Sequence, residues 1–524
     1  MNSWARSALA SMAASVALEL ARAEPPELQR LSPFFWSSSE SNRIELDLAH
    51  IDADTRVWTS FPCAAGPLSL VTNGRAASVV ALPPGIAPGY GWIRLVGRQG
   101  ISEPKWVAWD SREVAKRAAV LPKQAPPVSL ELPAAILGSF KERMVEMYRV
   151  PVNRGRPIWV EVIAASLGSK ADPFLELRAI HGRRLAFQED GFGVGADCRL
   201  HYLPEETGEL LLAIRDTEYG GGPDYRYVLR IADIPWTGAT NAVFSVPSGG
   251  SSAPTSYEQE PNDVTQKATV WIHGSGSMSG DFGGSGDIDW FRMRVSVAGK
   301  YAIRGRTRGL GSGAELRLRW IRSSTAVMAE STLTTGDDAL MEASLDVSTD
   351  YWVEVGELFG RSRDWHETGV GKAGGVKPGE APPGGWQYEL ECFPVAGVGV
   401  AVGSVTYQVP GGGKFEIPLT LTYPKDFKST VVFSVQDAGA GWSLEPREIA
   451  GTPKEVRLQV RVPEGATVGA IYSFRLGIGL GGADLSRVAP VSTRAALRKL
   501  WPGLVTPPRA VDGWLTVGVV EAPP

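Results

Sequence analysis

The sequence predicts an all-β protein, a multi-domain string of antiparallel β-sandwiches. Apolar and polar residues alternate with the two-residue period of half-buried strands, and long helical periods are nearly absent. Glycine (60) and proline (38) are abundant, which is typical of chains with many short strands and frequent turns. The length of 524 residues exceeds what one hydrophobic core supports, so three to five domains are expected.

Residues 1–23 have the features of an export signal peptide. Arg6 supplies positive charge, Ala8 to Leu20 form a short and mostly apolar stretch, and Ala21-Arg22-Ala23 fits the small-x-small cleavage rule. Glu19 interrupts the apolar stretch, and an ordinary N-terminal helix is the alternative. No later run approaches the roughly 20 apolar residues that span a bilayer. We therefore expect a protein without a transmembrane segment that is secreted, periplasmic or held at the cell surface.

The first β domain is predicted over residues 27–110. Ile44, Leu46 and Leu48 alternate with acidic residues, as one buried face of a strand would. Residues 111–134 are interpreted as a linker, with a short charged helical piece followed by several prolines.

Two further β domains follow, over residues 135–235 and 257–395. A flexible connector rich in glycine and serine, residues 236–256, separates them. Within the third domain, the glycine-rich stretch 368–385 has no apolar period and is expected to be a long surface loop.

A fourth β domain is predicted over residues 396–524. Phe415, Ile417, Leu419 and Leu421 lie on one face of a strand. A short helix is expected to follow from about Ser492 to Trp501, and a tail after it.

The second and third domains resemble each other, which predicts an internal repeat. The matching pairs are Tyr148-Arg149-Val150 with Phe291-Arg292-Met293, Leu211–Ile214 with Tyr351–Val355, and Tyr225–Leu229 with Trp386–Leu390.

The third domain carries the motifs of a known family. Glu258-Gln259-Glu260-Pro261-Asn262-Asp263, with Gly286-Asp287-Ile288-Asp289-Trp290-Phe291, resembles the bacterial pre-peptidase C-terminal (PPC) domain, a β-sandwich appended to many secreted proteases. The second domain is similar but lacks the Glu-Pro-Asn-Asp element, so only its scaffold carries over. The C-terminal domain, with Gly441-Trp442-Ser443, looks like immunoglobulin-like modules that flank secreted hydrolases. The resemblance implies an exported protein of jelly-roll and immunoglobulin-like domains, with an immunoglobulin-like first domain, and it implies this architecture and export far more than any activity.

Motifs for catalysis and for nucleic-acid binding are missing. Gly276–Gly280 has methionine where a GxSxG elbow needs its nucleophile, and His366-Glu367 lacks the second histidine of HExxH. Three widely spaced cysteines, Cys63, Cys198 and Cys392, exclude a full disulfide framework and are expected to be small buried residues. The net charge of −4 and the absence of basic runs argue against nucleic acid as a partner.

The third domain also offers a candidate calcium site. Calcium takes six to eight oxygen ligands at about 2.3–2.6 Å, and residues 258, 260 and 262 would share one side of an extended segment. Related domains in bacterial collagenases bind calcium with this segment and the GDxDxF loop. The alternative is structural, with a turn at residues 261–263 and loop amides bonded to the aspartates. The candidate ligands are Glu258, Glu260, Asn262, Asp263, Asp281, Asp287 and Asp289.

Three functions stay open. The first is a non-catalytic exported binding or scaffold protein that acts on an unknown protein or polysaccharide at the cell surface. Exposed tryptophans, with Trp159 and Trp352 as candidates, could stack on sugars or pack against a neighbouring domain. The second is an accessory module of a secreted peptidase or other hydrolase. The third is a carboxylate-based hydrolase that would use Glu189 and Asp190 with Asp216.

Overall fold

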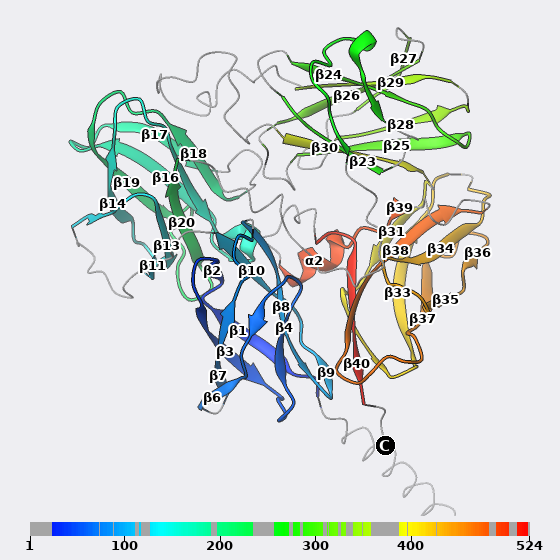
Figure 1. Ribbon diagram of the computed structural model, residues 1–524, viewed down its shortest axis with the longest axis horizontal. Helices are drawn as coiled ribbons and strands as arrows, with labels where there is room; N and C mark the ends of the chain where they lie inside the picture. Colours follow the sequence, from blue (N-terminus) through cyan, green and yellow to red (C-terminus); the bar gives the residue numbers. More distant parts are fainter. Residues whose placement is uncertain are drawn as a thin grey trace, which may run out of the picture.

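Four β-sandwiches follow one another along the chain in this computed structural model (Figure 1). The predicted all-β, multi-domain fold is confirmed, and α2 (Arg494–Leu500) is the one α-helix within the described residues. The predicted signal peptide 1–23 and the predicted loop 368–385 lie outside those residues, as does the predicted connector 236–256 except Ser256. The structure describes residues 24–72, 74–86, 88–110, 115–116, 126–189, 196–233, 256–271, 276–282, 287–307, 312, 314–322, 326–331, 339–347, 349–357, 387–395, 397–425, 427–481, 489–501 and 511–521.

The first sandwich packs two sheets around one core. One sheet contains β1 (Glu27–Ser32), β3 (Asn42–Ala49), β7 (Arg75–Ala81), β5 (Ala64–Ala65) and β6 (Ser69–Thr72). The other contains β2 (Phe35–Ser37), β10 (Lys105–Asp110), β8 (Gly89–Gly97), β4 (Arg56–Thr59) and β9 (Gly100–Ile101). The predicted alternation in β3 is confirmed, because Ile44, Leu46 and Leu48 are buried in the core of this sandwich.

The second sandwich begins earlier than predicted. Its sheets are β11 (Ala115–Lys116), β13 (Ala134–Ser139), β20 (Arg226–Ala232), β15 (Ile158–Ile163) and β18 (Cys198–Tyr202), and β12 (Val128–Ser129), β14 (Glu146–Val152), β19 (Gly208–Asp216), β16 (Pro173–Ala179) and β17 (Arg184–Glu189). The 3-10 helix η1 (Ala165–Leu167) follows β15. The linker assignment for 111–134 is corrected, since β11 and β12 pair in parallel with β13 and β14. The prolines before β12 are tolerated because it is an edge strand.

The third sandwich repeats this topology strand for strand. Its sheets are β21 (Ser256–Tyr257), β23 (Gly276–Asp281), β30 (Gln387–Pro394), β25 (Gly299–Arg306) and β28 (Ala339–Leu345), and β22 (Thr269–Trp271), β24 (Ile288–Met293), β29 (Tyr351–Glu357), β26 (Leu316–Arg322) and β27 (Ala326–Glu330), with 3-10 helix η2 (Thr265–Lys267) before β22. The predicted repeat matches this register, since Tyr148 pairs with Leu212 as Phe291 pairs with Val353.

The fourth sandwich includes the segment expected to be a tail. One sheet contains β31 (Gly399–Val402), β33 (Lys414–Thr422), β37 (Glu455–Arg461) and β35 (Ser443–Glu445). The other contains β32 (Thr406–Pro410), β40 (Trp514–Val520), β38 (Ile471–Leu480), β34 (Val431–Gln436), β36 (Glu448–Ile449) and β39 (Ala489–Pro490). The tail assignment is therefore wrong for β40, a wholly buried strand between β32 and β38. Its continuous apolar run suits a strand that is covered on both faces.

The first, second and fourth sandwiches share one hydrophobic cluster. It joins Trp106 of the first sandwich and Leu167 of the second to the helix α2 and Trp501. The Trp106 and Trp501 rings lie 4.7 Å apart, and both approach the backbone of Gly168. Figure 1 shows α2 at the meeting point of these three sandwiches. The third sandwich has a core of its own.

Buried ion pairs add to the contact between the first two sandwiches. Asp110 accepts from Arg230 at 2.8 Å, and Arg230 also donates to Glu161 at 2.7 Å. Glu161 receives a further bond from Arg199, again at 2.7 Å, and all four side chains are almost wholly buried. Charges taken out of water in this way need their partners, so the network holds these sheets in one relative position.

The contact between the first and fourth sandwiches buries an arginine. The Arg94 guanidinium of β8 donates to the Ser102 carbonyl (2.7 Å) and to the Thr406 hydroxyl (2.9 Å). Burial lowers the pKa of Arg94 to about 10. The strand β8 is thus covered on both faces, which is why the polar residue Arg94 on it is buried.

Candidate metal centre

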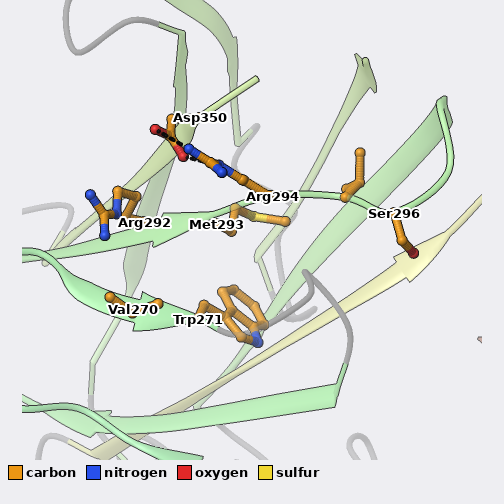
Figure 2. Close-up of a pocket in the computed structure, with 8 residues that line it drawn as sticks. Val270, Trp271, Arg292, Met293, Arg294, Ser296 and Asp350 are labelled. Atoms are coloured by element: carbon orange, nitrogen blue, oxygen red, sulfur yellow. Dashed lines mark hydrogen bonds and ion pairs between the residues drawn. The ribbon is translucent and has the colours of Figure 1, made fainter. Parts of the chain in front are cut away.

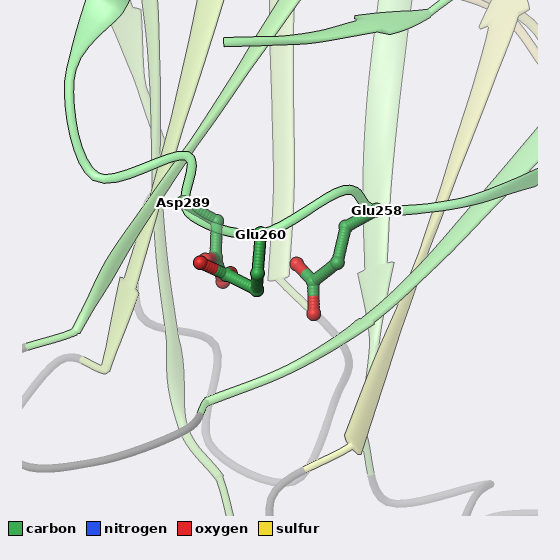
Figure 3. A group of neighbouring side chains, drawn as sticks. All are labelled: Glu258, Glu260 and Asp289. Carbon is green, nitrogen blue, oxygen red and sulfur yellow. The ribbon is translucent and has the colours of Figure 1, made fainter. Parts of the chain in front are cut away.

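Three carboxylates converge at one end of the third sandwich. Glu258 and Glu260 lie in the segment after β21, and Asp289 lies on β24 (Figure 3). Ligand oxygens of the three side chains lie within 4.8 Å of one another. The alternate positions 258 and 260 point to the same side, as the sequence predicts for an extended segment.

Asn262 completes the group from a fully buried position. Its side-chain amide approaches Asp289 Oδ1 at 2.9 Å and Glu260 Oε1 at 3.1 Å. Turned so that its nitrogen faces these oxygens, the amide donates a hydrogen bond to each. In the opposite orientation the Asn262 oxygen faces the oxygens of Asp289 and Glu260. The side chains then present only oxygen atoms to the centre. Whether the centre holds a cation therefore decides the orientation of the Asn262 amide.

Tyr388 closes the centre from the opposite sheet. Its hydroxyl lies 2.6 Å from Asp289 Oδ2 and 2.9 Å from Glu258 Oε2. The ring packs over Gly280, its direct partner across β23 and β30, where a Cβ would collide with both Tyr388 and Glu258. Sequence reasoning missed both residues. The signal was the second half of the repeat, since Gly138-Ser139-Phe140 and Tyr227 in the second sandwich match Gly280-Asp281-Phe282 and Tyr388.

Burial and mutual repulsion raise the pKa values of two of these carboxyl groups. Desolvation, with the charges of Glu260 and Asp281 adding to it, raises the pKa of Glu258 to about 7. Desolvation and the charge of Glu258 raise the pKa of Asp289 to about 9. At neutral pH the cation-free centre therefore retains protons that a divalent cation would displace.

The structure does not bring every predicted ligand to this point. Asp263 and Asp281 are exposed, and among the described residues neither joins the three-carboxylate cluster. The backbone N–H of Asp281 instead donates to Glu258 Oε1 at 2.6 Å. Asp287 lies close enough to raise the pKa of Asp289 but also stands outside the cluster. The centre thus consists of Glu258, Glu260, Asn262 and Asp289.

The donor set fits a hard divalent cation. Carboxylate and amide oxygens are the ligands that calcium prefers, and no nitrogen or sulfur ligand competes within the cluster. The buried Asn262 amide suits either state, because its nitrogen donates to Asp289 and Glu260 in the turned orientation and its oxygen would join the carboxylates around an ion. The structural alternative from the sequence stays open in the same geometry, with protons and the turned amide in place of the ion.

The carboxylates considered for hydrolysis do not form a catalytic pair in the described residues. Asp216 is 3% exposed and accepts the backbone N–H groups of Asp172, Glu218 and Gly220 at 2.8–3.1 Å. Asp216 therefore organises its own loop. Glu189 is exposed at the end of β17, and Asp190 lies outside the described residues.

The two tryptophans considered for sugar binding differ in their surroundings. Trp159 is 2% exposed and packs against His201, with ring centroids 4.7 Å apart, so its ring is not available for stacking on a ligand. Trp352 is half-buried on the outer face of the third sandwich and pairs with Arg292 across β24 and β29. His201 is the direct partner of Trp159 across β15 and β18, so the printed ring contact of Trp159 lies within its own sandwich.

A shallow cavity of about 350 Å³ lies beside Arg292 at the edge of the same sheet (Figure 2). Arg294 and Asp350 form a two-pronged ion pair at its rim, with distances of 2.5 and 3.0 Å, and this pair lowers the pKa of Asp350. Its lining residues are Val270, Trp271, Arg292, Met293, Arg294, Val295, Ser296 and Asp350.

Comparisons with known proteins identify no family. No protein-family profile and no curated protein match the chain. Among solved structures, the four N-terminal Ig domains of Dscam1 isoform 9.44 match at 13% identity, covering 90% of this chain and 99% of that chain, with a TM-score of 0.17. The C. elegans MSP family member WR4 matches at 11% identity over 24% of this chain and 100% of its own, with a TM-score of 0.14.

A third solved structure is much longer than this chain. The alpha-2-macroglobulin of E. coli matches at 13% identity over 88% of this chain and 29% of its own length, with a TM-score of 0.15. TM-scores this low carry no argument about function.

A membrane-spanning helix needs a minimum length and hydrophobicity. None of the helices in the described part of the chain is long and apolar enough to cross a membrane.

Proposed function

We propose that this protein is an exported, non-catalytic scaffold whose third, PPC-like sandwich is stabilised by calcium. The observation that carries the proposal is the convergence of Glu258, Glu260, Asn262 and Asp289 where the chain enters the third sandwich. An ion there would tie the segment after β21 to β24 and so fasten the sandwich to its connector. It would also neutralise carboxylates that otherwise repel one another or keep protons.

The surroundings of the centre favour a structural ion over a catalytic one. Asn262 and Asp289 are 0% exposed, and Tyr388 covers the side facing the opposite sheet. A catalytic ion needs an open position beside a substrate cleft. Here Asn262, Asp289 and Tyr388 close the inner side of the point, and Glu260 lies on its exposed side. The fused body of the first, second and fourth sandwiches supports the scaffold role, because shared cores hold domains in fixed relative positions.

Calcium titration of the full chain tests this proposal. We expect about one ion per chain by calorimetry, and stabilisation of about 2.7 kcal/mol at a hundredfold excess over Kd. Glu260→Ala removes an exposed ligand and should weaken calcium binding. Asp263→Ala removes an exposed carboxylate three residues along the chain and outside the cluster, so it should leave binding unchanged. Equal melting temperatures with calcium and with chelator, and no heat of binding at millimolar ion, would reject the calcium site.

A second candidate function is binding of an acidic extracellular polysaccharide on the outer face of the third sandwich. Trp290 and Arg292 share this face of β24, next to Trp352 on β29, and Arg294 directly follows the strand. In the described part of this face Arg294 pairs with Asp350, and Arg317 and Arg319 share Glu354. Glu330 lies opposite Arg319 on β27, so four arginines, with Arg292, meet three carboxylates there. Guanidinium groups recognise carboxylate or sulfate groups, and half-buried indoles offer a stacking surface for sugar rings.

Affinity electrophoresis in gels that contain polygalacturonate tests this second candidate. We expect the wild-type chain to be retarded, and Arg292→Ala or Trp352→Ala to lose most of the retardation. Arg457→Ala serves as the control because it removes an exposed arginine from the fourth sandwich. Equal mobility of the wild type and Arg292→Ala in every gel would contradict the role of this face.

Export is part of the proposal and has its own test. Arg6 and the Ala21-Arg22-Ala23 sequence support cleavage before Glu24. Mass spectrometry of the mature protein from its native host should find an N-terminus near Glu24. A full-length chain in the cytoplasm would contradict export without touching the calcium site.

A further inference from the structure

The second sandwich contains a counterpart of the metal centre in which tyrosines stand in place of the ligands. Glu146 of β14 occupies the position of Asp289 on β24, two residues before Tyr148 and Phe291. Tyr227 occupies the position of Tyr388, directly opposite Gly138 as Tyr388 is opposite Gly280. Phe140 packs on Tyr227 as Phe282 packs on Tyr388, with ring centroids 4.4 and 5.1 Å apart. Each repeat therefore buries a carboxylate under a tyrosine.

The two repeats differ in what else reaches that carboxylate. In the second sandwich, the hydroxyls of Tyr148 (3.2 Å) and Tyr227 both donate to Glu146 Oε2. The two hydroxyl oxygens lie 3.2 Å apart. In the third sandwich, the residue equivalent to Tyr148 is Phe291, which has no hydroxyl to donate. Asp289 instead has Glu258, Glu260 and Asn262 beside it.

The segments that precede the two carboxylates also differ in their oxygen ligands. Residues 117–127 join β11 to β12, and residues 258–268 join β21 to β22 with the same length. Counted along these segments, Glu258, Glu260 and Asn262 correspond to Arg117, Ala119 and Leu121. The sequence from 117 to 127 contains no acidic residue at all. The sequence of this segment therefore offers no carboxylate to match Glu258 and Glu260.

We propose that residue 291 and its counterpart 148 determine how each repeat stabilises its buried carboxylate. Phe291 leaves the third sandwich dependent on a divalent cation, whereas the Tyr148 hydroxyl takes the place of the cation in the second. This inference rests on the calcium site proposed above. It makes the chain asymmetric, with one cation-responsive sandwich attached to a body that does not respond to the ion.

A reciprocal pair of variants in the full chain tests the assignment. Phe291→Tyr supplies the missing donor and should weaken calcium binding by about tenfold, the effect of one buried hydrogen bond. In chelator the same variant should raise the hydrogen-exchange protection of β24 by a similar factor. Tyr148→Phe should lower the protection of β14 about tenfold, whether calcium or chelator is present, and should add no calcium site. Phe291→Leu is the control, because it removes the ring without adding a hydrogen-bond donor. In chelator, the hydrogen-exchange protection of β24 in this variant should be no higher than in the wild type.

The possible outcomes separate this inference from the calcium proposal. If the wild type binds calcium and Phe291→Tyr binds it with unchanged affinity and unchanged protection in chelator, the role of residue 291 is overturned while the site stands. If the wild type binds no calcium, the proposed function fails and residue 291 loses its role. In that case the response of β14 to Tyr148→Phe still measures the tyrosine contribution by itself. A calcium-dependent change of protection in β14 would overturn the asymmetry.

Discussion

The Tyr388 hydroxyl lies 2.6 Å from Asp289 Oδ2, and it connects the two sheets of the third sandwich at the buried end of the candidate metal centre. Tyr388 lies on β30 and Asp289 on β24, so the contact depends on how the two layers stack. The same contact recurs in the second sandwich between Tyr227 and Glu146. A buried carboxylate under a tyrosine is thus a property of the repeat, and the surrounding oxygens are particular to the third sandwich.

The stability of the third sandwich should fall as pH rises when calcium is absent. The folded-state pKa values of Glu258 (about 7) and Asp289 (about 9) exceed their ordinary values of 4.5 and 3.8, so the folded state binds more protons than the unfolded state. Their contribution is fully present below about pH 4 and is lost as pH rises toward about 9. Hydrogen-exchange protection factors of β24 measured in chelator should decline between about pH 5 and about pH 8.

Two controls accompany the pH prediction. Saturating calcium should remove most of the decline, because the ion displaces the protons and keeps both groups ionised. Asp289→Asn should make the decline in chelator smaller, since the amide does not titrate and Glu258 still does. Protection in β24 that rises with pH in chelator would contradict the folded-state pKa shifts.

Glu161→Gln should destabilise the joint between the first two sandwiches. Glu161 accepts bonds from Arg199 and Arg230 at 2.7 Å, and all three are buried. Removing the shared anion leaves buried cations undercompensated, which costs about 3–5 kcal/mol. Denaturant unfolding of the full chain measures the loss. The control Glu209→Gln breaks an exposed pair with Arg149 and should cost less than about 1 kcal/mol. Equal costs for the two variants would show that the network is not what holds this interface.

Gly518→Ala should loosen the contact between the first and fourth sandwiches. A Cβ on Gly518 of β40 would lie 2.5 Å from Ile101 Cγ2 of β9, so one of the strands must shift. Overpacking of this kind costs about 1–3 kcal/mol. Thermal unfolding and hydrogen exchange in β9 and β40 provide the readout. The control Gly208→Ala adds the same methyl where nothing lies within 4 Å, and a loss as large there would contradict the steric explanation.

The cysteines should resist alkylation in the native protein. Burial raises the pKa of the Cys63 thiol to about 11 and that of Cys392 further still. Cys198 is buried and donates to the Pro173 carbonyl at 2.9 Å. Iodoacetamide near neutral pH should therefore react more than about a hundredfold more slowly than with an exposed thiol. The expectation of three buried cysteines holds for Cys198 and Cys392, whereas Cys63 is half-buried. In denaturant all three should be labelled, and rapid labelling of Cys198 or Cys392 in the native chain would contradict their burial.

Much of the fold could be predicted because alternation is a local property. Ile44, Leu46 and Leu48 face the core as their two-residue period predicts, and the register of β14 with β19 recurs in β24 with β29. The predictions failed where pairing is not local. The short strands β11 and β12 fall in a stretch rich in proline and gain their structure from distant partners, and β40 is drawn into a sheet across the whole fourth sandwich.

The candidate site was predicted in part for a similar reason. The spacing of Glu258, Glu260 and Asn262 predicts that they share one side, and they do. Spacing does not say which aspartate of the Asp281, Asp287 and Asp289 group lies nearest, because that depends on the layer to which each belongs. The closest one is Asp289, which lies on the inward side of β24 together with Phe291 and Met293.

The sequence by itself determined the period of the strands, the repeat, and the supply of oxygen ligands in one segment of the chain. These properties depend on residues a few positions apart, where the geometry of an extended backbone leaves little choice. Only the tertiary structure decided that Tyr388 meets Asp289, that Arg94 lies between two sandwiches, and that three sandwiches share a core around Trp501. Those contacts join residues far apart in the chain, and close packing between layers selects among arrangements that the local pattern permits equally.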